Sequence, residues 1–116
     1  MKKLMMGFKY ACKGIYAAVV DQPNMRIHMV IASLVILLGF YLNVSQPEWY
    51  FLIFGIGAVI TAELFNSSLE GLVNLVEPRH QPLAGKVKDI AAGAVLVSAM
   101  AATLVGIMVF SKHMFP

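Results

Sequence analysis

Long uncharged apolar stretches, separated by short polar connections, make up most of the chain after its first twenty residues. One stretch runs from Ile90 to Ser111, and another runs from Met29 to Pro47, just after His28. About 20 consecutive apolar residues are enough to cross the hydrocarbon core of a bilayer as a helix. The pattern therefore predicts membrane spans at residues 27–46 and 86–111.

The segment between these two stretches predicts a third span with a more polar end. Residues 49–62 are apolar, Glu63 interrupts them, and apolar residues then recur as far as Pro78. A helix over residues 49–77 would be roughly 43 Å long at 1.5 Å per residue, which exceeds a hydrocarbon core of about 30 Å. We expect its C-terminal part to extend into the cytoplasmic interface.

The first 21 residues predict an amphipathic helix at the membrane surface. On a helical wheel Leu4 and Phe8 share one side, whereas Lys9 and Lys13 share another. Such a helix lies in the headgroup plane with its lysines toward lipid phosphates. A cleaved signal peptide is the alternative, but these lysines interrupt the apolar stretch that it would need.

Composition and charge agree with a single integral membrane domain over residues 1–116. Hydrophobic residues make up 59% of the chain and charged residues only 13%, about half the share usual for soluble domains. Lys and Arg lie mainly before residue 27 and in the connection at 77–89, and are absent from the connection at 43–48. The positive-inside rule therefore predicts a multi-pass protein with a cytoplasmic N-terminus. The basic N-terminal cluster suits a membrane surface, and we expect no nucleic-acid partner.

A stripe of polar side chains is the main candidate for a functional site. It follows one face of the middle helix at spacings of three and four residues and comprises Glu63, Asn66, Glu70, Asn74 and Glu77. Ionisable groups within a span are costly and normally face protein or a wet cavity. A polar seam between helices is the alternative. We favour a site in which Glu63, deeper in the apolar part, acts as a general base, and Glu70 holds a hard cation such as Mg²⁺.

Cationic and polar side chains near the same end of the spans suggest a polyphosphate ligand. They comprise Arg79, His80 and Gln81 in the connection and Lys88 and Asp89 at the start of the last span. Taken singly, each would be interpreted as a solvated loop residue or a membrane anchor. A P-loop enzyme is excluded because the sequence has no Gly-rich phosphate-binding loop of that type. The last span also carries small residues every fourth position, which predicts a close-packing face: Ala94, Ser98, Ala102 and Gly106.

These motifs resemble the signature of the prokaryotic diacylglycerol kinase family, which includes the undecaprenol kinases. The resemblance rests on Glu63-Leu-Phe-Asn-Ser-Ser-Leu-Glu70, on His80, and on Lys88-Asp-Ile-Ala-Ala-Gly-Ala-Val-Leu96. The segment Asn24-Met-Arg-Ile-His28 is similar to the undecaprenol-kinase branch. The resemblance implies an ATP-dependent lipid kinase of the bacterial inner membrane that uses Mg²⁺ and phosphorylates a lipid alcohol. It also implies a homotrimeric bundle with active sites shared between subunits at the cytoplasmic interface.

The resemblance assigns roles to individual positions. Glu63 matches the general base of the family, Asn66 its neighbouring amide, and Glu70 a metal-binding glutamate. The positions that contact nucleotide in the family correspond to Tyr10, Arg79, His80, Gln81, Lys88 and Asp89.

Two positions depart from the family pattern. Gln22 stands where the family usually has a second metal-binding Glu, and Asn74 stands where it has an Asp. Gln22 offers a carbonyl oxygen without a charge, so we expect weaker Mg²⁺ binding. Asp21 could replace Gln22 as a metal ligand. Adjacent side chains on a helix point about 100° apart, which argues against this replacement unless Asp21 lies in a loop.

Two other classes of protein remain open on the sequence. A small multispan transporter could use Glu63 to relay protons and Glu70 or Asn74 to bind a cation. No internal repeat of the kind common in transporters is visible in the chain. A non-catalytic membrane scaffold is also compatible with Gln22 and Asn74.

Overall fold

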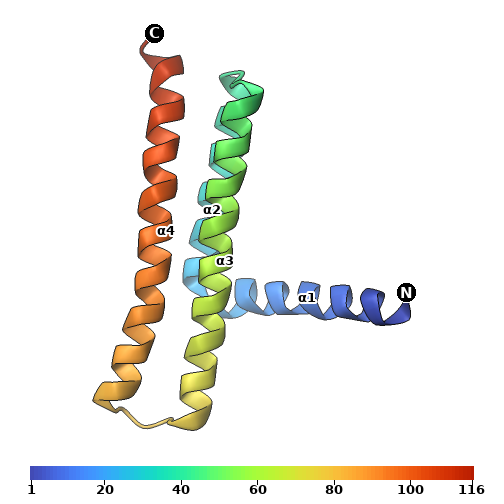
Figure 1. Ribbon diagram of the computed structural model, residues 1–116, viewed down its shortest axis with the longest axis vertical. Helices are drawn as coiled ribbons and strands as arrows, with labels where there is room; N and C mark the ends of the chain where they lie inside the picture. The colour runs from blue at the N-terminus through green and yellow to red at the C-terminus, as the bar shows by residue number, and fades with distance from the viewer.

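The computed structural model describes all 116 residues and consists of four α-helices without any strand (Figure 1). The helices are α1 (Lys2–Asp21), α2 (Pro23–Tyr41), α3 (Gln46–Val76) and α4 (Pro82–Met114). By length and composition α2, α3 and α4 can each cross a membrane. The structure thus confirms an all-helical chain with three candidate spans. We call the end of the bundle at residues 77–81 the inner end and the end at residues 42–45 the outer end, following the predicted orientation.

A sharp corner joins α1 to α2, and α1 lies across the bundle at a steep angle (Figure 1). Gln22 alone separates the two helices in an extended conformation, with φ −115° and ψ 111°. Pro23 favours this conformation because its ring disfavours a helical residue before it, whereas proline itself suits the first turn of a helix. Arg26 stabilises the corner: its Nη1 donates to the carbonyl oxygens of Val19 at 2.9 Å and Val20 at 2.7 Å. These carbonyls belong to the last turn of α1, where no later backbone N–H of the helix is available to donate to them.

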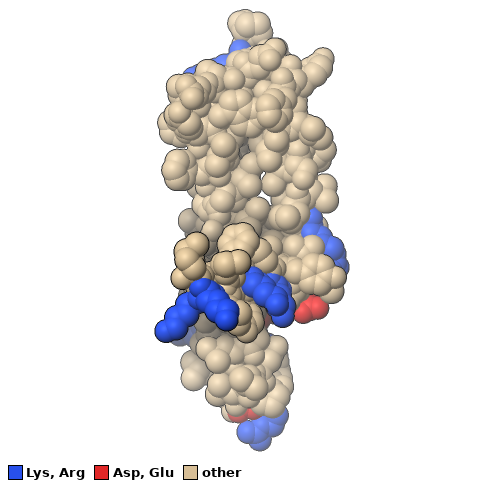
Figure 2. Space-filling model, turned by 90° about the vertical axis from the view of Figure 1, so that its right-hand side faces the viewer, with Lys and Arg blue, Asp and Glu red and all other residues tan.

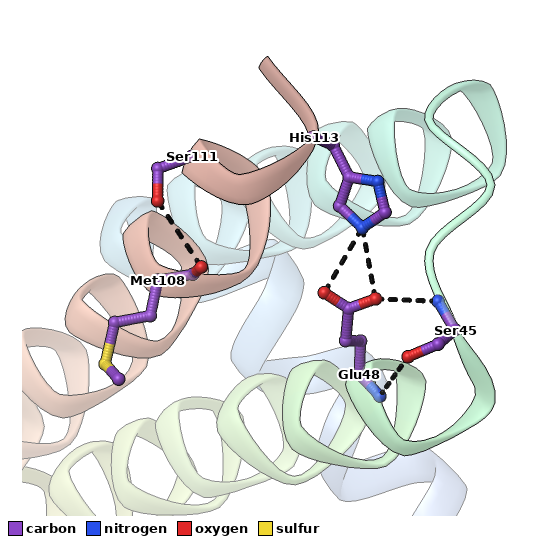
Figure 3. A network of polar contacts seen from close by, with 5 residues as sticks. All are labelled: Ser45, Glu48, Met108, Ser111 and His113. Carbon is purple, nitrogen blue, oxygen red and sulfur yellow. Dashed lines mark hydrogen bonds and ion pairs between the residues drawn. The ribbon is translucent and has the colours of Figure 1, made fainter. Parts of the chain in front are cut away.

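The outer end is held by a capping box and a histidine (Figure 3). The Ser45 N–H donates to the Glu48 carboxylate at 2.8 Å, and the Glu48 N–H donates to Ser45 Oγ at 3.4 Å. This reciprocal pair fixes the first turn of α3. His113, near the end of α4, places its Nε2 3.1 and 3.2 Å from the two carboxylate oxygens of Glu48. The connection occupies residues 42–45, slightly before the predicted one, because Asn43 takes a left-handed conformation with φ 52°.

The helices α3 and α4 lie side by side and form the most extensive interface of the fold (Figure 1). A Cβ added to Gly55 of α3 would lie 3.4 Å from the Cβ of Ala102, so small residues let the two backbones approach closely here. Only 11 of the 116 residues are buried in one chain. Lipid or further copies of the chain must therefore cover most of the apolar surface.

Charged side chains avoid a broad zone of the molecule. Figure 2 shows Lys and Arg side chains around the level of α1 and at the inner end, with an almost uncharged zone between that level and the outermost tip. Figure 1 shows that the inner turns of α3 and α4 extend beyond the level of α1. If α1 lies in the headgroup plane, as the sequence predicts, these turns project out of the membrane.

Candidate functional site

The polar stripe of α3 runs from a buried end to an exposed end. Glu63 is 1% exposed and Asn66 is 8% exposed, and these are the two buried polar side chains of the molecule. Glu70 is half-buried, and Asn74 is exposed. The stripe therefore points its first two members into the protein, where α1, α2 and α4 surround α3.

The buried end of the stripe is unsatisfied. Both carboxylate oxygens of Glu63, the Asn66 Oδ1 and the Ser67 Oγ are buried and have no hydrogen-bond partner. Leaving a buried polar group unpaired costs about 1–3 kcal/mol, and more for a charged one, so proteins almost always avoid it. Four such atoms within five residues of one helix indicate a place where a ligand, water or another chain completes the hydrogen bonding.

His28 of α2 is the side chain that approaches Glu63 from another helix. Its Nε2 lies 3.8 Å from Glu63 Oε2, just beyond hydrogen-bond distance, and its imidazole is 19% exposed. From the sequence, His28 is only the residue before the first uncharged stretch and the end of the Asn24–His28 segment, and neither observation predicts this contact. A histidine at the very start of an uncharged span was the available signal, because polar groups at that depth tend to face other helices.

A hollow of about 500 Å³ separates the second half of α1 from α3. Its polar lining residues are Asp21 and Gln22 on one side and Ser67 and Ser68 on the other. Asp21 is the last residue of α1 and Gln22 lies outside the helix, so both can line the same hollow although they are adjacent. The structure therefore brings the two candidate metal ligands at the α1–α2 corner to the face of α3 that carries the unpaired Ser67 hydroxyl.

This set of side chains fits a magnesium ion in its chemistry. Asp21, Gln22 and Ser67 line the hollow and can each offer an oxygen ligand, which Mg²⁺ prefers, and Ser67 Oγ is a buried oxygen without a partner; Glu70 does not line the hollow. Magnesium commonly takes one or two carboxylates from a protein and completes its shell with phosphates and water. No cluster of three His, Cys, Asp or Glu side chains exists within one chain, so such a site would depend on phosphate oxygens, water or a second copy.

The connection between α3 and α4 is organised around Glu77. Its carboxylate accepts hydrogen bonds from Arg79 Nε at 3.0 Å, from the Arg79 backbone N–H at 3.1 Å and from Gln81 Nε2 at 3.2 Å. The Arg79 side chain, through its hydrogen bonds, lowers the pKa of Glu77 below its ordinary value. The Arg79 side chain nevertheless stays 82% exposed and accessible to an anion, and His80 is exposed as well.

Within one chain no ion pair joins the other predicted nucleotide contacts to the buried glutamate. The Tyr10 ring is exposed on α1, with the Lys13 ammonium 5.8 Å from its centroid. Lys88 is half-buried and Asp89 is exposed near the start of α4. No ion pair joins Lys88 to Glu63 or to Glu70 in the single chain.

Comparison with known proteins agrees with this arrangement. Residues 9–110 match the model of the prokaryotic diacylglycerol kinase family. The chain is 33% identical over 110 residues to an undecaprenol kinase of Bacillus subtilis, covering 95% of this chain and 89% of that protein. It is 38% identical over 104 residues to a diacylglycerol kinase of Synechocystis sp., covering 89% of this chain but only 59% of that protein. It is 26% identical over 104 residues to a diacylglycerol kinase of Escherichia coli, covering 90% of this chain and 85% of that protein. The matched region contains the buried end of the α3 stripe, the α1–α2 corner and the start of α4, and the chain belongs to the prokaryotic diacylglycerol kinase family.

Proposed function

We propose that this protein is a lipid kinase that transfers the γ-phosphoryl group of ATP to the hydroxyl of a membrane lipid alcohol, undecaprenol or diacylglycerol. The names of its relatives support this activity. The observation that carries the proposal is the carboxylate of Glu63, which is buried within the candidate span α3 and has no hydrogen-bond partner. A general base needs free oxygen atoms to accept a proton, and a structural glutamate would have used them already.

In this proposal Glu63 accepts the hydroxyl proton of the lipid as the hydroxyl oxygen attacks the γ-phosphorus. The new oxygen–phosphorus bond forms while the bond from the γ-phosphorus to its bridging oxygen breaks, and ADP leaves. Asn66, one turn along α3 and also buried, orients the carboxylate or the hydroxyl through its amide. Exclusion of water around Glu63 strengthens each of these electrostatic interactions.

Binding of the nucleotide is proposed to use half-buried and exposed groups at the α1–α2 corner, on α3 and near the inner end. Glu70, with Gln22 and Asp21 at the α1–α2 corner, would hold Mg²⁺, which when bound neutralises charge on the phosphates. Arg79 and Lys88 would bind phosphate oxygens. The remaining proposed nucleotide contacts are Tyr10, His80, Gln81 and Asp89. The neutral Gln22 makes this a weaker magnesium site than one with a second glutamate.

We further propose a homotrimer in the bacterial inner membrane, with a cytoplasmic N-terminus and α1 in the headgroup plane. The large apolar surface left uncovered by one chain supports assembly. The lack of an ion pair between Lys88 and Glu63 within one chain supports assembly as well, because a neighbouring copy can supply the missing cation.

The test is phosphoryl transfer by the purified protein in mixed micelles with labelled ATP, Mg²⁺ and either undecaprenol or diacylglycerol. We expect label in the lipid, and a loss of turnover of about 10²- to 10⁴-fold on Glu63→Gln. Glu48→Gln, the same change at the outer end, is the matched control and should retain most activity. Absence of labelled lipid with both acceptors would contradict the kinase proposal, and ATP-independent flux of a substrate would favour a transporter. Near-normal turnover by Glu63→Gln would exclude Glu63 as the base.

A further inference from the structure

An apolar cavity of about 570 Å³ lies between α2, α3 and α4. Hydrophobic residues make up 16 of its 21 lining residues, and the others are two glycines, His28, Thr103 and Ser111. Thr103 Oγ1 donates to the Ala99 carbonyl at 2.7 Å, and Ser111 Oγ donates to the Met108 carbonyl at 3.4 Å. These hydroxyls are thus engaged by their own helix, and the imidazole of His28 is the polar group that remains available to a ligand.

The cavity runs along one face of α3 and ends about one helical turn before Glu63, which does not itself line it. Its α3 wall includes Gly55, Val59 and Ile60. Glu63 follows four residues after Val59 and three residues after Ile60. Residues at these spacings are neighbours on one helix face. His28 lines the cavity and its Nε2 lies 3.8 Å from Glu63 Oε2, so this histidine connects the apolar wall with the buried carboxylate behind it.

The spacing of this pair suits a hydroxyl group. Because His28 Nε2 and Glu63 Oε2 are 3.8 Å apart, one oxygen atom can lie within hydrogen-bond distance, about 2.8 Å, of both. The imidazole N–H can donate to the hydroxyl oxygen while the hydroxyl donates to the carboxylate. The second lone pair of the oxygen then remains free for attack on phosphorus.

We infer that the acceptor lipid places its hydrocarbon chain in the α2–α3–α4 cavity and its hydroxyl between His28 and Glu63. This inference rests on the proposed kinase function. In the transfer step His28 holds the oxygen, Glu63 takes its proton, the oxygen–phosphorus bond forms, and ADP departs with the electrons of the broken bond. His28 thereby becomes a further residue that contacts the substrate.

The cavity also selects a class of acceptor. A buried ester carbonyl costs free energy unless it finds a donor, and the walls offer no free donor other than His28. The site therefore favours an alcohol whose only polar group is its hydroxyl, such as a polyprenol, over diacylglycerol with its two esters. A second hollow, of about 710 Å³, is the competing location for the chain. It lies on another face of α3 and α4, includes Gly57 and Asn66, and has no residue of α2.

Two matched substitutions discriminate between the two hollows. Gly106 lines the first cavity and Gly57 the second, and a Cβ added at either position meets no atom within 4 Å. Gly106→Leu should raise the KM for a long-chain polyprenol about tenfold or more, with little change in the KM for ATP or in turnover of a short-chain prenol. Gly57→Leu should leave all three values within about twofold. The opposite pattern, or no effect of Gly106→Leu on a correctly folded protein, would overturn the inference.

Photolabelling of the wild-type protein tests the same point without any substitution. A polyprenol that carries a diazirine on its chain should label α2 at Ile31 and Val35, which line only the first cavity. Labelling confined to Ile53 and Phe54 would place the chain in the second hollow and overturn the inference. Absence of label from α2, together with a change of oligomeric state in Gly106→Leu, would assign the cavity to a second copy of the chain. If the wild-type protein phosphorylates no lipid at all, the kinase proposal fails first, so the two failures remain distinct.

Substitutions of His28 test the hydroxyl-binding role directly. His28→Leu should lower kcat by about 10²-fold, the usual loss on removal of one aligned donor, with the KM for ATP unchanged. His28→Gln should recover a substantial part of the loss, since its side-chain amide still donates. Equal losses in the two variants would show that donation is unimportant, and an unchanged kcat in His28→Leu would exclude the role.

Discussion

Gly39 of α2 lies against the indole ring of Trp49 in the first turn of α3, so replacing it with alanine should destabilise the fold. A Cβ at position 39 would stand 2.6 Å from Cη2 of the ring and 3.0 and 3.1 Å from two further ring atoms. Carbon atoms prefer separations of about 3.5–4.0 Å. The ring also packs against Phe40 in a tilted arrangement, with centroids 4.8 Å apart, so it cannot swing aside without losing that contact.

The magnitude follows from two opposing effects. Overpacking of this kind costs about 1–3 kcal/mol, whereas Gly→Ala within a helix gains up to about 1 kcal/mol. Gly57→Ala should show only the gain in helix stability without the overpacking cost, because its new methyl group meets no atom within 4 Å. We therefore expect Gly39→Ala to be less stable than Gly57→Ala by about 1–3 kcal/mol, and close to or below the wild-type protein.

The assay is equilibrium unfolding in mixed micelles of increasing SDS content, followed by circular dichroism in all variants and also by fluorescence in those that keep the single tryptophan. A double-mutant cycle with Trp49→Leu tests the cause. If the ring is responsible, Gly39→Ala should lose its penalty in that background. Equal stability of Gly39→Ala and Gly57→Ala, or a penalty that persists without the ring, would refute the reasoning.

Three further predictions concern charged groups. Glu70→Gln should raise the Mg²⁺ concentration for half-maximal transfer about tenfold, and an unchanged titration would contradict its proposed role. At the outer end, a double-mutant cycle of Glu48→Gln and His113→Gln should give a small favourable coupling in unfolding experiments; zero coupling would show that the contact adds no stability. Arg79→Ala should return the pKa of Glu77 upward toward its ordinary value, as measured by carboxyl NMR titration. A carboxyl with a lowered folded-state pKa stabilises the fold above its unfolded-state pKa and loses this contribution as the pH falls through the folded-state pKa. The wild-type protein should therefore be more stable than Arg79→Ala near neutral pH, and the two should converge in acid; a constant difference would contradict this.

Local features of the sequence predicted the membrane spans and the polar face because both depend on short-range physics. An apolar stretch of about 20 residues suits the bilayer wherever it stands in the chain, and a repeat of three and four residues gives one helix face. The capping box of Ser45 and Glu48 was also visible as a serine followed three residues later by a glutamate. Its recognition would have placed the start of α3 at Gln46 and shortened the predicted first span.

Periodicity could not tell which members of the polar stripe are buried. Glu63 and Glu70 lie on one face of α3, yet Glu63 is buried and Glu70 is only half-buried, because the surrounding helices cover the stripe unevenly along its length. Periodicity also could not predict that Asp21 and Gln22 line the same hollow. Their shared hollow depends on the corner at Pro23, where α1 turns away and Gln22 leaves the helix.

The sequence by itself determined the number of spans, the polar face and the family, since each is encoded within a helix or a contiguous motif. Only the tertiary structure brought His28 to Glu63 and His113 to Glu48, the latter pair 65 residues apart in the chain. Such contacts depend on how far each helix extends and on the angles at which the helices cross. Those quantities follow from the packing of whole faces, such as Gly55 against Ala102, and no single segment specifies them.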